Sequence, residues 1–176
     1  MATFSLNEEL EAYAALARRI EDLLRGDSAT LTRVNPAVSA WSPVQHAAHV
    51  TLANELVLKN LGNLARGSGM LVVFEAQPIP RALEILSRGS LPRGEAQAPR
   101  MVVPPRDVDV ATTVEWAAKF TADLDAFRST VDAETLPRCF IPHQVLGPLD
   151  AGQWARFGVA HTRHHLAIAG EASGLA

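Results

Sequence analysis

The sequence predicts an all-α protein, a four-helix bundle with one long crossover between its second and third helices. Four long stretches repeat apolar residues at steps of three and four, which is the spacing of one face of an α-helix. The alternation typical of strands is weak and is confined to a short apolar stretch at residues 70–74. A proline-rich stretch at residues 67–107 separates the second helix from the third, so a simple up-down-up-down order is not expected.

The four predicted helices cover residues 6–25, 42–65, 109–131 and 150–170. The first begins with a capping-box pattern, because Glu8 follows three residues after Ser5. Its core face carries apolar side chains at helical spacing, namely Leu6, Leu10, Tyr13, Ala17, Ile20 and Leu24. The second begins where Ser42 can cap free backbone amides and Pro43 suits the first helical position.

The third and fourth predicted helices each show one apolar side. The third repeats apolar residues at Val110, Val114, Ala117, Phe120, Leu124 and Phe127, and the fourth at Trp154, Phe157 and Ile168. Between the second and third helices we expect an irregular crossover over residues 67–107, with a short helix at 80–87. A connection of this length in a compact domain is usually functional or crosses the bundle.

The composition fits an ordinary globular protein. Of 176 residues, 48% are hydrophobic and 20% are charged, so we expect a single domain over residues 1–176 with a substantial core. Acidic residues number 19 and basic residues 16, and this net charge of −3 predicts no nucleic-acid partner. The one cysteine leaves no pair for an internal disulfide.

The chain shows no targeting or membrane signal. Its first residues contain neither a basic segment nor an apolar segment of the kind found in secretory signals. No stretch reaches the roughly 18 continuous apolar residues of a membrane span. We therefore expect a cytoplasmic protein without a membrane partner, and a lone reduced cysteine fits that compartment.

The histidines of the fourth predicted helix are its most informative residues. On a helical wheel, His161 and His165 fall on the face that carries Phe157, whereas His164 falls on the polar edge. Two histidines four residues apart can place both imidazoles on one metal ion, because their side chains lie one turn apart. For this pair we favour metal binding over a purely structural role.

The second predicted helix carries His46 and His49, and both could point inward. A lone inward histidine is more often a hydrogen-bonded core residue, and this interpretation is preferred for His46. Burying several imidazoles without partners costs roughly 1–3 kcal/mol for each unsatisfied group, and a shared metal ion would satisfy them together. His143 follows a proline in a predicted loop and is expected to be a surface residue, although it could approach the same end of the bundle.

These residues resemble the motifs of a known family. Trp41, Ser42 and Pro43 followed by His49 resemble the second-helix motif of the DinB/YfiT-like superfamily, and the segment 161–166 (HTRHHL) resembles its fourth-helix motif. The motifs stand in the expected order on either side of a long crossover. Prolines and glycines in the crossover and ahead of Trp154 resemble a DinB-related subfamily without an assigned activity.

The resemblance implies a four-helix bundle of up-down-down-up topology that binds a divalent metal ion, often nickel or zinc, on three histidines. Carried over residue by residue, the ligands are His49, His161 and His165. Family members with known activity include transferases and isomerases that use bacillithiol, mycothiol or glutathione. Others are described as metal-dependent hydrolases or damage-inducible proteins. Many are dimers, so a homodimer is expected.

A site of this type suits catalysis. Three protein ligands leave coordination positions open, which is the pattern of catalytic zinc sites. The ion could lower the pKa of bound water toward about 7 or hold a thiol as thiolate. Hydrolysis lacks an identified base, because Thr162 stands where the H-E-x-x-H motif has glutamate. The nearest carboxylates, Glu55 and Glu171, fall toward polar faces, so a base would have to come from the crossover.

Other reactive or charged residues give weaker signals. Cys139 is a poor candidate nucleophile and is expected to be a small buried residue. Arg93, Arg100 and Arg106 in the crossover could recognise a carboxylate or phosphate, but solvated loop charges explain them equally well.

The leading hypothesis is a metal-dependent enzyme, a thiol (S-)transferase or a hydrolase, acting on a small molecule. Its cofactors would be a divalent metal ion, zinc or nickel, and a low-molecular-weight thiol. The alternative is a non-catalytic metal- or ligand-binding protein related to stress. A third hypothesis is a bundle with structural histidines and no metal. The residues are compatible with both an enzyme and a non-catalytic protein.

Overall fold

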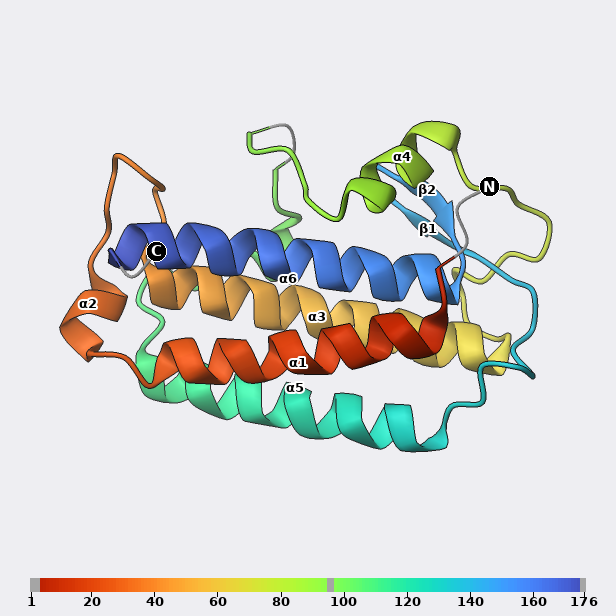
Figure 1. Cartoon of the computed structure of the whole chain (residues 1–176), viewed down its shortest axis with the longest axis horizontal. Helices are drawn as coiled ribbons and strands as arrows, with labels where there is room; N and C mark the ends of the chain where they lie inside the picture. Colours follow the sequence, from red (N-terminus) through yellow and green to blue (C-terminus); the bar gives the residue numbers. More distant parts are fainter. Residues whose placement is uncertain (1–3, 95–96, 175–176) are drawn as a thin grey trace.

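The computed structural model describes residues 4–94 and 97–174. Within these residues, four long helices lie side by side: α1 Leu6–Leu24, α3 Pro43–Arg66, α5 Val110–Thr130 and α6 Ala151–Ser173. Figure 1 shows α1 and α6 running in one direction and α3 and α5 in the other. Both α5 and α6 pack against α1 and against α3. The predicted all-α class is confirmed.

Side-chain caps begin each long helix. The Ser42 hydroxyl accepts from the Gln45 amide, and the Gln45 side chain accepts from the Ser42 amide, which completes a capping box on α3. Asp150 and Gln153 form the same arrangement on α6. The C-terminus of α6 lies beyond its predicted end. The helix ends at Ser173 and is capped by Gly174, whose φ of 73° suits glycine. The predicted last residue, Gly170, lies inside the helix.

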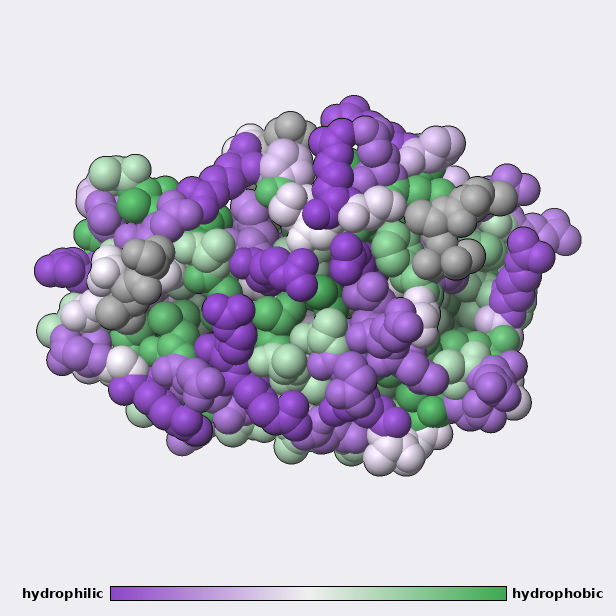
Figure 2. Space-filling view, in the orientation of Figure 1, coloured by the Kyte–Doolittle hydropathy of each residue, from purple (hydrophilic) through white to green (hydrophobic). Residues whose placement is uncertain are grey.

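The core lies between the four helices and contains the predicted face of α1. Its largest fully buried side chains include Tyr13, Phe120, Leu61 and Leu124. The Tyr13 ring of α1 packs directly on the α6 backbone at Gly158, where an added Cβ would lie 2.6 Å from Tyr13 Cζ. On the outer face in Figure 2, hydrophilic side chains form broad bands with smaller hydrophobic areas between them.

Several short elements were not predicted. A one-turn helix, α2 Ser28–Thr32, follows α1, and an antiparallel hairpin, β1 Ile141–His143 and β2 Gly147–Leu149, precedes α6. Pro142 pairs with Pro148 across the hairpin, so the two missing amide hydrogens fall at a single ladder position. The strands have three residues each and contain prolines, so the sequence shows no alternation of apolar and polar residues that would predict a hairpin. Within the stretch at 70–74, Val73 forms a lone bridge with Phe140.

The segment between α3 and α5 is anchored on α6. It holds α4 Pro80–Arg88 and a 3₁₀ turn, η1 Arg100–Val102. The end of α4 receives hydrogen bonds from two α6 arginines: Arg156 Nε donates to the Leu86 carbonyl at 2.8 Å, and Arg163 Nη1 donates to the Gly89 carbonyl at 3.3 Å. The Leu86 carbonyl also accepts from the Gly89 amide that caps α4, so the arginines add to the hydrogen bonds at this helix end. Figure 1 shows α4 outside the four-helix bundle, and Ile79, which precedes α4, lies against Gly147 of β2.

No helix in the described part of the chain is long and apolar enough to cross a membrane.

Candidate metal centre

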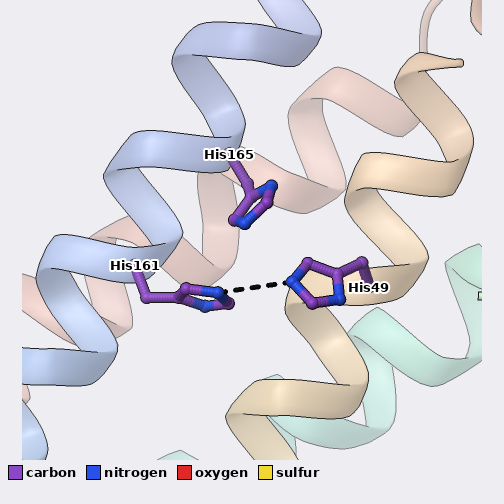
Figure 3. A group of neighbouring side chains, drawn as sticks. All are labelled: His49, His161 and His165. Carbon is purple, nitrogen blue, oxygen red and sulfur yellow. Dashed lines mark hydrogen bonds between the residues drawn. The ribbon is translucent and has the colours of Figure 1, made fainter. Parts of the chain in front are cut away.

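Three histidines from two helices point into one space in the bundle. His49 comes from α3, and His161 and His165 come from successive turns of α6 (Figure 3). One ring nitrogen from each lies within 4.8 Å of the other two. The Nε2 atoms of His49 and His161 are 3.3 Å apart. The group was predicted from helical spacing and family resemblance, and the fold brings it together.

Local sequence explains this convergence. The capping box at Ser42 fixes where α3 begins and therefore which face His49 occupies. The pair on α6 faces α3 because side chains four residues apart share one face of a helix. Since α3 and α6 pack directly against each other, the two faces enclose the imidazoles.

The His49 imidazole is held in one tautomer by the segment between α3 and α5. Its Nδ1 lies 2.7 Å from the Val102 carbonyl oxygen in η1. A carbonyl can only accept, so Nδ1 carries the proton and Nε2 carries the lone pair. The ring is only 2% exposed. Its lone pair therefore faces the space shared with the other two histidines, as a metal ligand requires.

The outer nitrogens of the other two histidines differ. His165 Nδ1 lies 3.0 Å from Nδ1 of His46 on α3. His161 Nδ1 is buried and has no hydrogen-bond partner among the described residues. Two of the three histidines thus have a protein partner on the side away from the shared space.

Burial keeps these imidazoles neutral. Desolvation, together with the nearby His49, His164 and His143, lowers the pKa of His161 to about 3. Desolvation also takes the pKa of His165 far below its usual range and lowers that of His49, although the Val102 hydrogen bond opposes the change in His49. Neutral rings have the free lone pairs that a divalent cation needs.

Aromatic rings border the histidines on two sides. The Trp41 ring centroid lies 4.9 Å from that of His49 and 6.5 Å from that of His165. The Phe157 ring stacks on His161, with centroids 5.4 Å apart and planes 24° apart. These contacts limit ring rotation and exclude water from part of the site.

The remaining predicted histidines have mixed outcomes. His46 is 3% exposed with partners at both ring nitrogens, so the preferred core role is confirmed. The expectation that His143 is a surface residue is wrong. It ends β1, it is half-buried against Trp154 and Phe157, and its Nδ1 accepts from two backbone amides of the hairpin turn. His164 is half-buried, and its ring lies edge-on to His165.

The other predicted residues lie outside the histidine group. Cys139 is buried, as expected, and its thiol donates to the Leu64 carbonyl. Arg93 makes a two-bond ion pair with Glu171 of α6, at 3.0 Å and 2.5 Å, so neither is a free charge at the site. Arg100 and Arg106 are exposed.

Sequence reasoning missed the atoms that orient the ligands. Nothing in the residue types marks the Val102 carbonyl, because a backbone acceptor is present at every position. The contact of His46 with His165 joins residues 119 positions apart in the chain, so no local pattern shows it. A second inward histidine on the same helix as His49 was the only sequence signal.

The donor set fits a divalent transition metal. Imidazole nitrogens suit zinc, nickel, copper and iron, and three of them leave coordination positions for another ligand. The fold and the site together define a helical-bundle protein with a candidate three-histidine metal centre.

The chain belongs to the DinB superfamily, whose family model matches residues 9–169. The match includes all three histidines. Comparison with curated proteins and with solved structures gives no match.

Proposed function

We propose that this DinB superfamily protein binds a divalent metal ion, zinc or nickel, through Nε2 of His49, His161 and His165. The observation that carries the proposal is the convergence of three neutral imidazoles, of which His49 has its lone pair fixed toward the shared space by Val102. The helix directions in Figure 1 support the up-down-down-up arrangement of the family. We propose that the chain forms one domain.

The chemistry that best suits the site is transfer of a low-molecular-weight thiol to a small molecule. When bound, the ion would supply a positive charge that lowers the pKa of a coordinated thiol or water. The protein's residues would orient the ligands through Val102 and would exclude water through Trp41 and Phe157. The histidine group contains no carboxylate, and Glu171 is engaged by Arg93. Hydrolysis, which needs a base for water, is therefore less well supported than thiol transfer.

The missing carboxylate also supports a second candidate, a protein that binds a metal ion and a small ligand without turnover. Such a protein would need the three ligands and an open coordination position but no proton acceptor. The two candidates share the metal site and differ only in whether a substrate is converted.

Metal analysis of protein purified without a histidine tag tests the site. We expect about one zinc or nickel ion per chain after loading, none in His161→Ala, and a full ion in His164→Ala. His164 is the matched control, because its ring also touches His165 but lies outside the convergent group. Equal binding by both variants would contradict the ligand assignment, and no binding by the unaltered protein would overturn the proposal.

Turnover separates the two candidates. Glutathione, bacillithiol and mycothiol are each incubated with a panel of small electrophiles, with the loaded protein and with the same protein after chelation. We expect consumption of one thiol that depends on the ion and is lost in His161→Ala. A loaded protein that gives no ion-dependent rate with any pair would favour the binding protein.

A further inference from the structure

His46 makes the only side-chain hydrogen bond that the described residues provide to the three-histidine group from outside it. Its Nδ1 lies 3.0 Å from Nδ1 of His165, and its Nε2 lies 2.8 Å from the Ser39 hydroxyl. The chain of contacts thus runs from His165 through His46 to the loop that precedes α3. The Trp41 amide donates to the same Ser39 oxygen at 3.1 Å, which fixes that hydroxyl beside the helix.

The distance between the two Nδ1 atoms requires a proton between them. Two facing lone pairs would repel at 3.0 Å, so one ring donates and the other accepts. If His165 donates, its Nε2 keeps the lone pair and His46 donates onward from Nε2 to Ser39. If His46 donates, the neutral His165 must carry its proton on Nε2, where it blocks metal binding. The contact therefore has one arrangement that permits metal binding and one that does not.

We propose that His46, anchored by Ser39, is a positioning residue that accepts the Nδ1 proton of His165 and so keeps the Nε2 lone pair of His165 facing the metal site. This inference rests on the proposed function. It gives His165 a hydrogen-bond acceptor at Nδ1, as the Val102 carbonyl does for His49. The two partners come from different parts of the chain, His46 from α3 and Val102 from η1.

The surroundings hold His46 in place. His46 is 3% exposed and lies in the first turn of α3, four residues after the Ser42 cap. The Trp41 ring packs edge-on against it at 5.5 Å, with the planes at 66°. With a bond at each nitrogen and an indole against its side, the imidazole cannot turn without losing partners.

The test compares zinc affinity in three variants by competition with a chelator. His46→Phe keeps the ring but removes both nitrogens, and we expect about 10- to 100-fold weaker binding, the usual effect of losing a residue that orients a ligand. His46→Asn keeps an acceptor at the place of Nδ1 and should recover most of the loss. His164→Phe makes the same change in a ring that touches His165 without a hydrogen bond, and it should bind like the unaltered protein. Unchanged affinity in His46→Phe, or an equal loss in His164→Phe, would overturn the proposal.

Nitrogen NMR of the metal-free protein gives a readout that does not depend on the ion. We expect His165 to be protonated at Nδ1 and not at Nε2 in the unaltered protein, and to become a mixture in His46→Phe. A His165 protonated mainly at Nε2 in the unaltered protein would refute the role of His46, even if His46→Phe failed to fold. A protein that binds no zinc would instead refute the proposed function, while this NMR measurement would still decide the role of His46.

Discussion

At the scale of single residues, the role of each histidine depends on the hydrogen-bond partner of each ring nitrogen. His143, which is not one of the three candidate ligands, illustrates this. Its Nδ1 accepts from the amides of Val145 and Leu146, at 3.2 Å and 3.1 Å, so this nitrogen must stay unprotonated. Desolvation lowers its pKa to about 4. The neutral imidazole therefore stabilises the hairpin turn.

Acid should weaken the stabilisation of the hairpin turn by His143. In the unfolded chain His143 binds a proton near its ordinary pKa of 6.5, whereas in the folded chain it does so only near about 4. Its contribution is thus complete above pH 6.5 and is lost as the pH falls toward 4. We expect His143→Ala to lower the free energy of unfolding at pH 8 by about 1–3 kcal/mol and to flatten the fall between pH 6.5 and 4. Urea unfolding of metal-free protein measures both, and an unchanged pH slope would contradict the assignment.

Gly158 of α6 leaves room for the Tyr13 ring of α1. A Cβ there would lie 2.6 Å from the fully buried Tyr13 ring, so Gly158→Ala should lower stability by about 1–3 kcal/mol. Gly62→Ala is the matched control, because its Cβ would meet only the end of the Arg66 side chain, at 3.4 Å. That variant should be neutral or slightly more stable. Equal thermal shifts in the two variants would argue against close packing at Gly158.

At the scale of elements, the caps and apolar faces made the long helices predictable. Ser42 and Asp150 are side-chain signals that act within three residues, so a sequence shows them directly. The β1–β2 hairpin was not predictable, because its prolines are usually read as loop residues. Its stability comes from packing of Ile141 and Leu149 in the core, which no local pattern reveals.

The candidate site likewise has a part that the sequence predicted and a part that it did not. Helical spacing placed His161 and His165 on one face, and family resemblance added His49. The Val102 carbonyl and the His46 contact depend on how η1 and α3 pack against distant residues, and sequence spacing carries no information about that. The buried position of His143 was missed for the same reason, since its hairpin was not recognised.

Loss of the α3 cap should destabilise the helix that carries His49. Ser42→Ala removes the acceptor for the Gln45 amide and one half of the capping box, and we expect a loss of about 1 kcal/mol. Ser87→Ala provides the comparison, because that exposed hydroxyl only donates to the Leu83 carbonyl within α4. Chemical unfolding should show a clear shift for the first and almost none for the second. A silent Ser42→Ala would mean that the cap does not limit stability.

At the scale of the whole molecule, the candidate metal centre joins helices from opposite parts of the chain. An ion that binds the folded state alone stabilises it by mass action, by about 2.7 kcal/mol at a free concentration of 100 times Kd. We expect zinc to raise the melting temperature of the unaltered protein, a chelator to reverse the rise, and His161→Ala not to respond. A similar rise in that variant would show that the ion stabilises the protein from another place.

The separation of His49 and His161 by 112 positions also has a kinetic consequence. Neither α3 nor α6 alone contains the three ligands, so an ion can be held tightly only once the two helices have met. If they meet after the rate-limiting step of folding, zinc slows unfolding and leaves the folding rate unchanged. If they meet before it, zinc accelerates folding. The division of the zinc effect between the two rates therefore reports when the α3–α6 pair forms along the folding pathway.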